Sequence, residues 1–310
     1  MKVAYIFPGQ GSQKVGMGRD LCDNFASARA IFEQADEALG FPLSRLCFEG
    51  QDDELRQTIN TQPALITVSY ACLKAAYEAG GNGLLPPAFV AGHSLGEYTA
   101  LAAASVLDFP TIVYLARERG RLMHEAGLRE PGGMVAIIGL DEALLAEVCA
   151  QTGTWMANVN CPSQLVISGA KENLTKATEL AKAKGAQRTI PLPVSGAFHT
   201  PLMQSAVDGL SEVIATLSFR DPLFPIVANT SAQPITKAEQ VKAELLGQLS
   251  HGVQWQRSIE YMINDGVATF IEIGPGEVLT GLIRRINKDV KTLNIGDVDT
   301  IRHLASLSPN

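Results

Sequence analysis

The sequence predicts an α/β protein built on a parallel β-sheet, with a smaller βαββαβ unit inserted into it. Two observations carry this prediction. Strand-like and helix-like segments alternate through the first and last thirds of the 310 residues, and such alternation is typical of a parallel sheet covered by helices on both faces. Between them, residues 128–198 follow the order strand, helix, strand, strand, helix, strand, which is the ferredoxin-like pattern.

The elements of the first third follow from apolar runs, helical periodicity and turn residues. They are a strand VAYIF (3–7), helices near 25–39 and over 63–80, a short strand AFVAG (88–92), a turn at Ser94 with a helix of small residues after it, and a helix over 108–127. Asp108 is a plausible N-cap of that last helix, and Pro110 suits its first turn.

The middle and last thirds are assigned in the same way. The middle segments are the strand MVAIIGL, a helix DEALLAEVCAQ capped by Asp141, the strands WMANVN and QLVISGA, a helix ending at Gly185, and the strand QRTIPLPV. The last third contains a helix from Pro201, the strand FPIVANT, helices near 237–250 and 255–264, and the strand TFIEIG. The C-terminal tail, which ends LASLSPN, is expected to be peripheral.

Composition excludes several classes of protein. The chain is 46% hydrophobic and 18% charged, with a net charge of −7, so non-specific nucleic-acid binding is not expected. No apolar run approaches 18 residues, which predicts no membrane span. The five cysteines (Cys22, Cys47, Cys72, Cys149 and Cys161) are scattered without a C-x-x-C pair. They predict a reducing, cytoplasmic compartment and no zinc site.

The stretch AGHSLGEYTA allows two interpretations of Ser94. Ser94-x-x-Glu97 before an apolar run matches a capping box, in which the serine only caps a helix. Gly92-x-Ser94-x-Gly96 also matches a nucleophile elbow, a sharp strand-to-helix turn that exposes a reactive serine. A capping box needs no glycine on either side of its serine. An elbow needs both, because neighbouring chain passes close to the turn.

Arg119 occupies an unexpected place on its helix. At about 100° per residue, it falls within a stripe of apolar side chains (Ile112, Leu115, Ala116, Leu122, Met123 and Ala126). A guanidinium there is costly unless a carboxylate pairs with it. The head group could reach solvent, or an internal acid could neutralise it. The third hypothesis is that it binds a substrate carboxylate in a bidentate pair.

A serine nucleophile also needs a base and oxyanion donors. His199 follows a strand and a glycine, in the kind of loop where α/β sheets place active groups. The alternative is that His199 is an ordinary surface or core residue, but the other four histidines are less suitably placed. The glycines of FPGQGSQ would let the Gln10 N–H approach a substrate, and the Leu95 N–H, next to Ser94, would be the second donor. A plain glycine-rich turn is the alternative for the first of these.

Taken together, these motifs resemble those of the malonyl-CoA:acyl carrier protein transacylase family. The resemblance runs from FPGQGSQ to EIGPGEVLTGL, and its middle markers are GHSLGEYTAL, RERGRLM, NVNCPSQLVISG, GAFHTPLM, VANTSA and QLSHGVQW. It implies an α/β-hydrolase-like catalytic core formed by residues 1–127 and 199–310, with a ferredoxin-like subdomain at 128–198. It also implies transfer of a malonyl group from malonyl-CoA to acyl carrier protein, for fatty-acid or polyketide synthesis.

The resemblance also assigns roles to individual residues. Ser94 is similar to the family's acylated nucleophile, His199 to its base and Arg119 to its carboxylate-binding arginine. The further matches are Gln248, whose backbone carbonyl would orient the histidine; Gln10 and Leu95 as oxyanion-hole donors; and Asn158, Asn160 and Phe198 lining the cleft. Phe198 in GAFH resembles the malonyl-selective form of the family. No metal or other cofactor is implied, since malonyl-CoA is the substrate.

Two other classes of protein could also carry some of these motifs. A patatin-like or thioesterase-type serine hydrolase would also use a serine elbow, but it gives Arg119 no partner. A non-catalytic binding module would not require both Ser94 and His199. Acyl carrier protein is acidic, so a local basic patch is expected to receive it, with Lys182, Lys184, Arg188, Arg284 and Arg285 as candidates.

Overall fold

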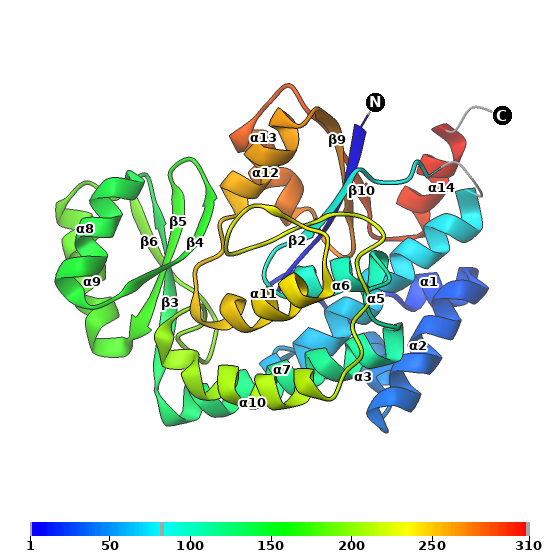
Figure 1. Ribbon diagram of the computed structural model, residues 1–310, viewed down its shortest axis with the longest axis horizontal. Coiled ribbons are helices and arrows are strands. Elements are labelled where there is room, and N and C mark those ends of the chain that lie inside the picture. The colour runs from blue at the N-terminus through cyan, green and yellow to red at the C-terminus, as the bar shows by residue number, and fades with distance from the viewer. Residues whose placement is uncertain (1, 81–83, 308–310) are drawn as a thin grey trace.

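A computed structural model describes residues 2–80 and 84–307 of the chain (Figure 1). Its larger sheet has the strand order β10-β9-β1-β2-β7-β8. These strands are β1 (Lys2–Phe7), β2 (Phe89–Gly92), β7 (Ile226–Val227), β8 (Pro234–Ile235), β9 (Val267–Ile273) and β10 (Lys291–Ile295). All neighbouring strands are parallel except β7 and β8. The predicted α/β class with a parallel sheet is confirmed.

Both faces of this sheet are buried, as the near-continuous apolar sequence of β1 requires. Val3, Tyr5 and Phe7 point into one hydrophobic core, and Ala4 and Ile6 point into another. The first core includes side chains from α2 (Ala26–Leu39), α5 (Thr58–Gly80), α7 (Phe109–Arg129) and α10 (Gln204–Ala215). The second includes side chains from α12 (Trp255–Asn264) and α13 (Val278–Ile286).

The smaller sheet is antiparallel and has the order β4-β5-β3-β6. Its strands are β3 (Gly132–Ile138), β4 (Trp155–Cys161), β5 (Gln164–Ala170) and β6 (Arg188–Pro191). This is the ferredoxin-like order that the sequence predicts. Helices α8 (Glu142–Thr152) and α9 (Lys171–Ala183) share one core with the sheet, and together they form one end of the molecule in Figure 1. Asp141 caps α8 by accepting from Ala143 N at 2.8 Å.

One strand of the small sheet also touches the large unit. Val159 N in β4 donates to Val253 O at 2.9 Å, and Val253 N donates to Ala157 O at 2.8 Å. This bridge lies between α11 (Ala238–Ser250) and α12. It holds the inner end of β4, with Asn158 and Asn160, against the loops at the carboxyl end of the large sheet.

Helix α5 begins earlier than its sequence indicates. Expected from residue 63, it starts at Thr58 and carries Pro63 inside it. Proline has no N–H and leaves the carbonyl four residues before it without a helical partner. Here Arg117 Nη1 donates to that carbonyl, Ile59 O, at 2.9 Å. A tertiary contact thus replaces the missing helical hydrogen bond and extends the helix by a turn.

The C-terminal segment is not peripheral as expected. Strand β10 completes the edge of the large sheet, and α14 (Val298–Leu307) packs against α5 with Ile301 buried. The last three residues, 308–310, lie outside the described part of the chain. Short segments that helical periodicity could not reveal are α1 (Arg19–Asn24), α3 (Leu43–Glu49), α4 (Asp52–Leu55) and a 3₁₀ turn at Pro201–Met203. Among the described helices, none is long and apolar enough to cross a membrane.

Candidate active site

Ser94 lies on a strained turn between β2 and α6 (Gly96–Ala103), with φ of 50°. Both flanking glycines are required there. A Cβ on Gly92 would lie 1.9 Å from the carbonyl carbon of Gly96, and one on Gly96 would lie 2.0 Å from the carbonyl oxygen of Phe7. Ser94 N donates to Asn229 Oδ1 at 2.6 Å, and α6 has no side-chain cap. The geometry is that of an elbow and not of a capping box.

His199 reaches Ser94 from the loop after the small sheet. Its Nε2 lies 2.8 Å from Ser94 Oγ, and its Nδ1 lies 2.7 Å from the backbone oxygen of Gln248 at the end of α11. A carbonyl only accepts, so Nδ1 carries the hydrogen and Nε2 offers its lone pair to the serine hydroxyl. The structure therefore brings Ser94, His199 and Gln248 together in the arrangement of nucleophile, base and orienting group.

Burial and charge weaken the affinity of His199 for a proton. The ring is almost fully buried, and burial together with the nearby Arg119 charge lowers its pKa from 6.5 to about 3. A base must be unprotonated to accept the hydroxyl proton. His199 therefore stays in its basic form far below neutral pH.

The pH profile of acyl loading should show this effect. The free-enzyme kcat/KM for loading should stay flat from about pH 8 to about pH 5, because His199 protonates well below the ordinary histidine pKa of about 6.5. Rapid-quench loading assays across this range, with circular dichroism to confirm folding, test the prediction. In Arg119→Ala, the acid limb measured with acetyl-CoA should move to higher pH. A wild-type limb near the ordinary histidine value would contradict this account.

Arg119 projects from α7 into the same site and is only 1% exposed. Its Nη1 donates to Gln62 Oε1 at 2.8 Å, and its Nη2 donates to Gln248 Oε1 at 2.7 Å and to Ser94 Oγ at 3.3 Å. Its Nε–H has no partner among the described residues. The guanidinium is therefore held by neutral amide oxygens and keeps donor capacity free beside the serine.

Neither alternative explanation of Arg119 fits. Its head group does not reach solvent, and within residues 2–80 and 84–307 no carboxylate lies at ion-pair distance from it. Glu97 contributes favourable charge only at longer range, with the Gln248 amide between the two groups. The cation thus has no carboxylate in direct contact among the described residues and suits an incoming anion.

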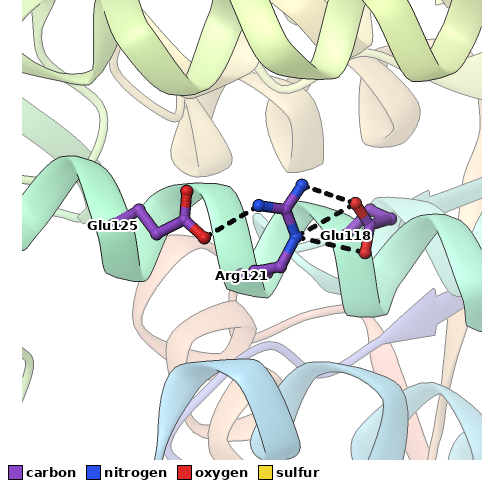
Figure 2. A network of polar contacts seen from close by, with 3 residues as sticks. All are labelled: Glu118, Arg121 and Glu125. Carbon is purple, nitrogen blue, oxygen red and sulfur yellow. Dashed lines mark hydrogen bonds and ion pairs between the residues drawn. The ribbon is translucent and has the colours of Figure 1, made fainter.

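Arg121, two residues further along α7, shows what an ordinary arginine on this helix does. Figure 2 shows its guanidinium between Glu118 and Glu125, with N–O distances of 2.7 Å and 2.8 Å. All three side chains come from the polar face of the helix, as the sequence pattern predicts. The contrast with Arg119 makes Arg121 a matched control for mutation.

Gln10 and Leu95 bring two backbone amides to the same pocket. Gln10 follows β1 and is fixed by its side chain, which donates to Thr58 Oγ1 at 3.1 Å. Leu95 directly follows the serine. Neither backbone N–H donates to another residue in the described part of the chain. Both amides are thus free to donate to an oxyanion.

The pocket at Ser94 is small and continues outward. A cavity of about 90 Å³ is lined by Ser94, His199, Arg119, Gln10, Leu95, Met123, Phe198 and their neighbours. A second cavity of about 250 Å³ shares His93 and Asn158 with it and extends between the small sheet and α13. Asn160 Oδ1 lies 2.8 Å from His93 Nε2. Asn158 Oδ1 is buried and has no described partner, so it is ready to accept a hydrogen bond from a ligand.

Several residues of the site were not identified from the sequence. Gln62 holds Arg119, and Asn229 holds the serine turn by accepting from Ser94 N and donating to Gly92 O. The sequence held one signal for Gln62, because the polar residues Thr58, Asn60, Thr61 and Gln62 come just before the apolar run that follows Pro63. The structure places all four in the first turns of α5 and buries them. Within the described residues, no group of three or more His, Cys, Asp or Glu side chains could hold a metal ion.

Comparisons with known proteins agree with this geometry. The family model described as "Acyl transferase domain" matches residues 4–305. The chain is 45% identical to the malonyl CoA-acyl carrier protein transacylase of Bacillus subtilis over 305 residues, covering 97% of this chain and 95% of that protein.

Two solved structures extend the likeness to three dimensions. The acyl-carrier-protein-S-malonyltransferase of Bartonella henselae superposes with a TM-score of 0.94 at 41% identity, covering 99% of both chains. A malonyl-transacylase in complex with its type II PKS acyl-carrier protein superposes with a TM-score of 0.94 at 37% identity, also covering 99% of both.

Proposed function

The chain belongs to the malonyl-CoA:acyl carrier protein transacylase family, and from this premise we propose how its own residues carry out the reaction. The enzyme transfers the malonyl group from malonyl-CoA to the phosphopantetheine thiol of acyl carrier protein, for fatty-acid or polyketide synthesis. One observation carries the assignment of residues. A serine hydroxyl lies 2.8 Å from a buried imidazole and 3.3 Å from a buried guanidinium that has no carboxylate at ion-pair distance among the described residues.

In the first half-reaction, His199 Nε2 accepts the Ser94 proton as Oγ attacks the thioester carbonyl. The Gln10 and Leu95 N–H groups stabilise the tetrahedral oxyanion. The protonated imidazole is held by the Gln248 carbonyl and returns its proton to the leaving CoA sulfur. A malonyl-Ser94 ester remains. The thiol of acyl carrier protein then attacks this ester while His199 accepts its proton, and the proton passes to Ser94 Oγ as the bond between that oxygen and the malonyl carbonyl breaks. These steps transfer protons and an acyl group without net oxidation or reduction, so the proposed mechanism calls for no redox cofactor.

Arg119 selects the acyl group in this proposal. Its free N–H groups bind the malonyl carboxylate while the other end of the three-carbon unit lies at Ser94 Oγ. The small cavity and the buried Phe198 ring leave little room for an acyl group with a branch at its middle carbon. The outer cavity would take the pantetheine arm, with Asn158 Oδ1 accepting from one of its amide N–H groups and Asn160 fixed by His93.

The two proposed parts of the chain fit this placement of the pantetheine arm. We assign residues 1–127 and 199–310 to the catalytic core and residues 128–198 to the subdomain. The outer cavity lies between β4 and β5 on one side and α13 on the other, so each part supplies one wall. The five cysteines are buried and unpaired, which supports a reducing, cytoplasmic setting.

Weighing both proteins after the reaction tests the function. The enzyme mixed with malonyl-CoA alone should gain the mass of one malonyl group. On addition of phosphopantetheinylated carrier protein, that mass should move to the carrier. Release of free malonate without any acylated carrier protein would instead indicate a serine hydrolase.

The basic side chains near the cavity mouth are the proposed dock for the acidic carrier protein. Arg188 pairs with Ile138, and Ile138 pairs with Gln164, which lines the outer cavity. Arg285 Nη1 donates to the same Gln164 at 2.6 Å, with Arg284 beside it on α13. Lys182 and Lys184 lie at the end of α9, where Lys184 is paired with Glu147. The two exposed arginines that flank Gln164 therefore form the centre of the dock.

Charge reversal should separate the two substrates. Arg188→Glu combined with Arg285→Glu should raise the KM for carrier protein severalfold and leave the KM for malonyl-CoA unchanged, because long-range charge guides protein docking. Steady-state kinetics at low salt measures both constants. Arg302→Glu, on α14 at the other end of the molecule (Figure 1), is the control. If the double variant and the control behave alike, the dock lies elsewhere.

A further inference from the structure

Glu97 is a buried acid that the mechanism above does not use. It lies in the first turn of α6, one turn after Ser94, and is 1% exposed. In a capping box its side chain would return to the Ser94 N–H. Here Asn229 Oδ1 accepts from that N–H, so the carboxyl of Glu97 is available for other contacts.

The two partners of Glu97 are residues that hold the catalytic groups. Its Oε1 accepts from Asn229 N at 3.1 Å, and its Oε2 accepts a short hydrogen bond from Gln248 Nε2. The Asn229 side chain binds the serine turn on both sides, through Ser94 N at 2.6 Å and Gly92 O at 2.7 Å. One carboxyl thus touches a support of the nucleophile and a support of the base.

Gln248 makes three further contacts, all with residues of the active site. Its backbone oxygen binds His199 Nδ1, its Nε2 donates to Ser94 O at 3.0 Å, and its Oε1 accepts from Arg119 Nη2 at 2.7 Å. A flipped amide would turn its NH₂ group toward the guanidinium, donor against donor. Because Glu97 accepts from the NH₂ side, it favours the orientation that offers Oε1 to Arg119.

We propose that Glu97 is a positioning residue that holds Asn229 and Gln248, and through them sets the distances among Ser94, His199 and Arg119. The proposal rests on the proposed function of these three residues. It predicts that a change at Glu97 alters both the rate of loading and the preference for malonyl over acetyl groups. Small displacements of reacting groups cost up to about 100-fold in rate.

Glu97→Gln is the sharpest test. It conserves the size of the side chain but replaces one of the two accepting carboxylate oxygens by an NH₂ group. One of the two incoming N–H donors then faces a donor. We expect kcat for malonyl loading, per active site counted by the mass of malonyl-enzyme, to fall about 10- to 100-fold. The malonyl-to-acetyl preference should fall as well. Glu272→Gln is the matched control, since Glu272 is also buried and accepts from the backbone N–H groups of Leu279 at 3.0 Å and Thr280 at 2.7 Å.

The outcomes distinguish this proposal from the underlying function. If wild-type enzyme forms malonyl-enzyme while Glu97→Gln matches the control in kcat and preference, Glu97 has no positioning role. A lower melting temperature with unchanged kcat per active site and unchanged preference would also overturn the proposal. Failure of the wild type to load malonyl would refute the function itself. If Glu97→Gln does not fold, Gln248→Met tests the same link, because it keeps the backbone carbonyl and should lose the preference.

Discussion

Replacement of Ser94 by alanine should abolish the malonyl-enzyme and reduce malonyl transfer to carrier protein by at least about 10⁴-fold. The reason is geometric. Ser94 Oγ lies 2.8 Å from His199 Nε2, beside the free amides of Gln10 and Leu95. Removing the hydroxyl leaves the base and the oxyanion donors with no nucleophile to act on. Intact-protein mass after incubation with malonyl-CoA measures the adduct, and peptide mapping locates it.

The control for this substitution is Ser105→Ala. Ser105 also has a positive φ, 57°, on a turn after α6, so it matches Ser94 in residue type and in backbone strain. The control should load malonyl like the wild type. An adduct of the same mass and at undiminished rate in Ser94→Ala would mean that another residue carries the acyl group.

The fold could be predicted in outline because its signals are local. Asp108 and Asp141 cap their helices as expected, with Asp108 Oδ1 accepting from Thr111 N at 2.9 Å. The strand order of the small sheet follows the expected pattern. The early start of α5 depends on Arg117, a residue far along the chain that binds the carbonyl freed by Pro63. The packing of α14 on α5 is equally non-local, so no local pattern could reveal either.

In the active site, too, local patterns predict some features and long-range contacts determine the others. Gly92-x-Ser94-x-Gly96 and the apolar stripe around Arg119 are short-range patterns, and each pointed to a residue that the structure places at the pocket. The contacts that hold these residues together join segments up to 154 positions apart, as between Gln248 and Ser94. The Glu97 side chain fits a local capping box in the sequence, yet Asn229 takes that place in the fold. A local sequence pattern cannot anticipate a competing partner from the distant turn after β7.

Arg119→Ala should reduce malonyl loading far more than acetyl loading. The guanidinium is buried, its hydrogen-bond partners among the described residues are neutral, and its Nε–H has no described partner. Losing one partner of a buried, hydrogen-bonded charge pair costs about 2–5 kcal/mol, which is roughly 30- to several thousand-fold in kcat/KM. An acetyl group has no carboxylate, so its loading loses none of this. Removal of an unpaired buried cation can even favour it.

Arg121→Ala is the matched control on the polar face of the same helix. It breaks the two partly exposed ion pairs with Glu118 and Glu125 (Figure 2), and such pairs contribute at most about 1 kcal/mol each. The control removes an arginine side chain only two residues away, but this side chain does not line the pocket. We expect its malonyl and acetyl loading rates to match those of the wild type.

The ratio of malonyl to acetyl kcat/KM, compared between Arg119→Ala and Arg121→Ala, is the most direct test of how the enzyme recognises its acyl group. If the buried guanidinium binds the malonyl carboxylate, the ratio collapses in the first variant and stays at the wild-type value in the second. If both loading rates fall equally in Arg119→Ala and the ratio is unchanged, the carboxylate is recognised elsewhere and the central role given to this residue is wrong.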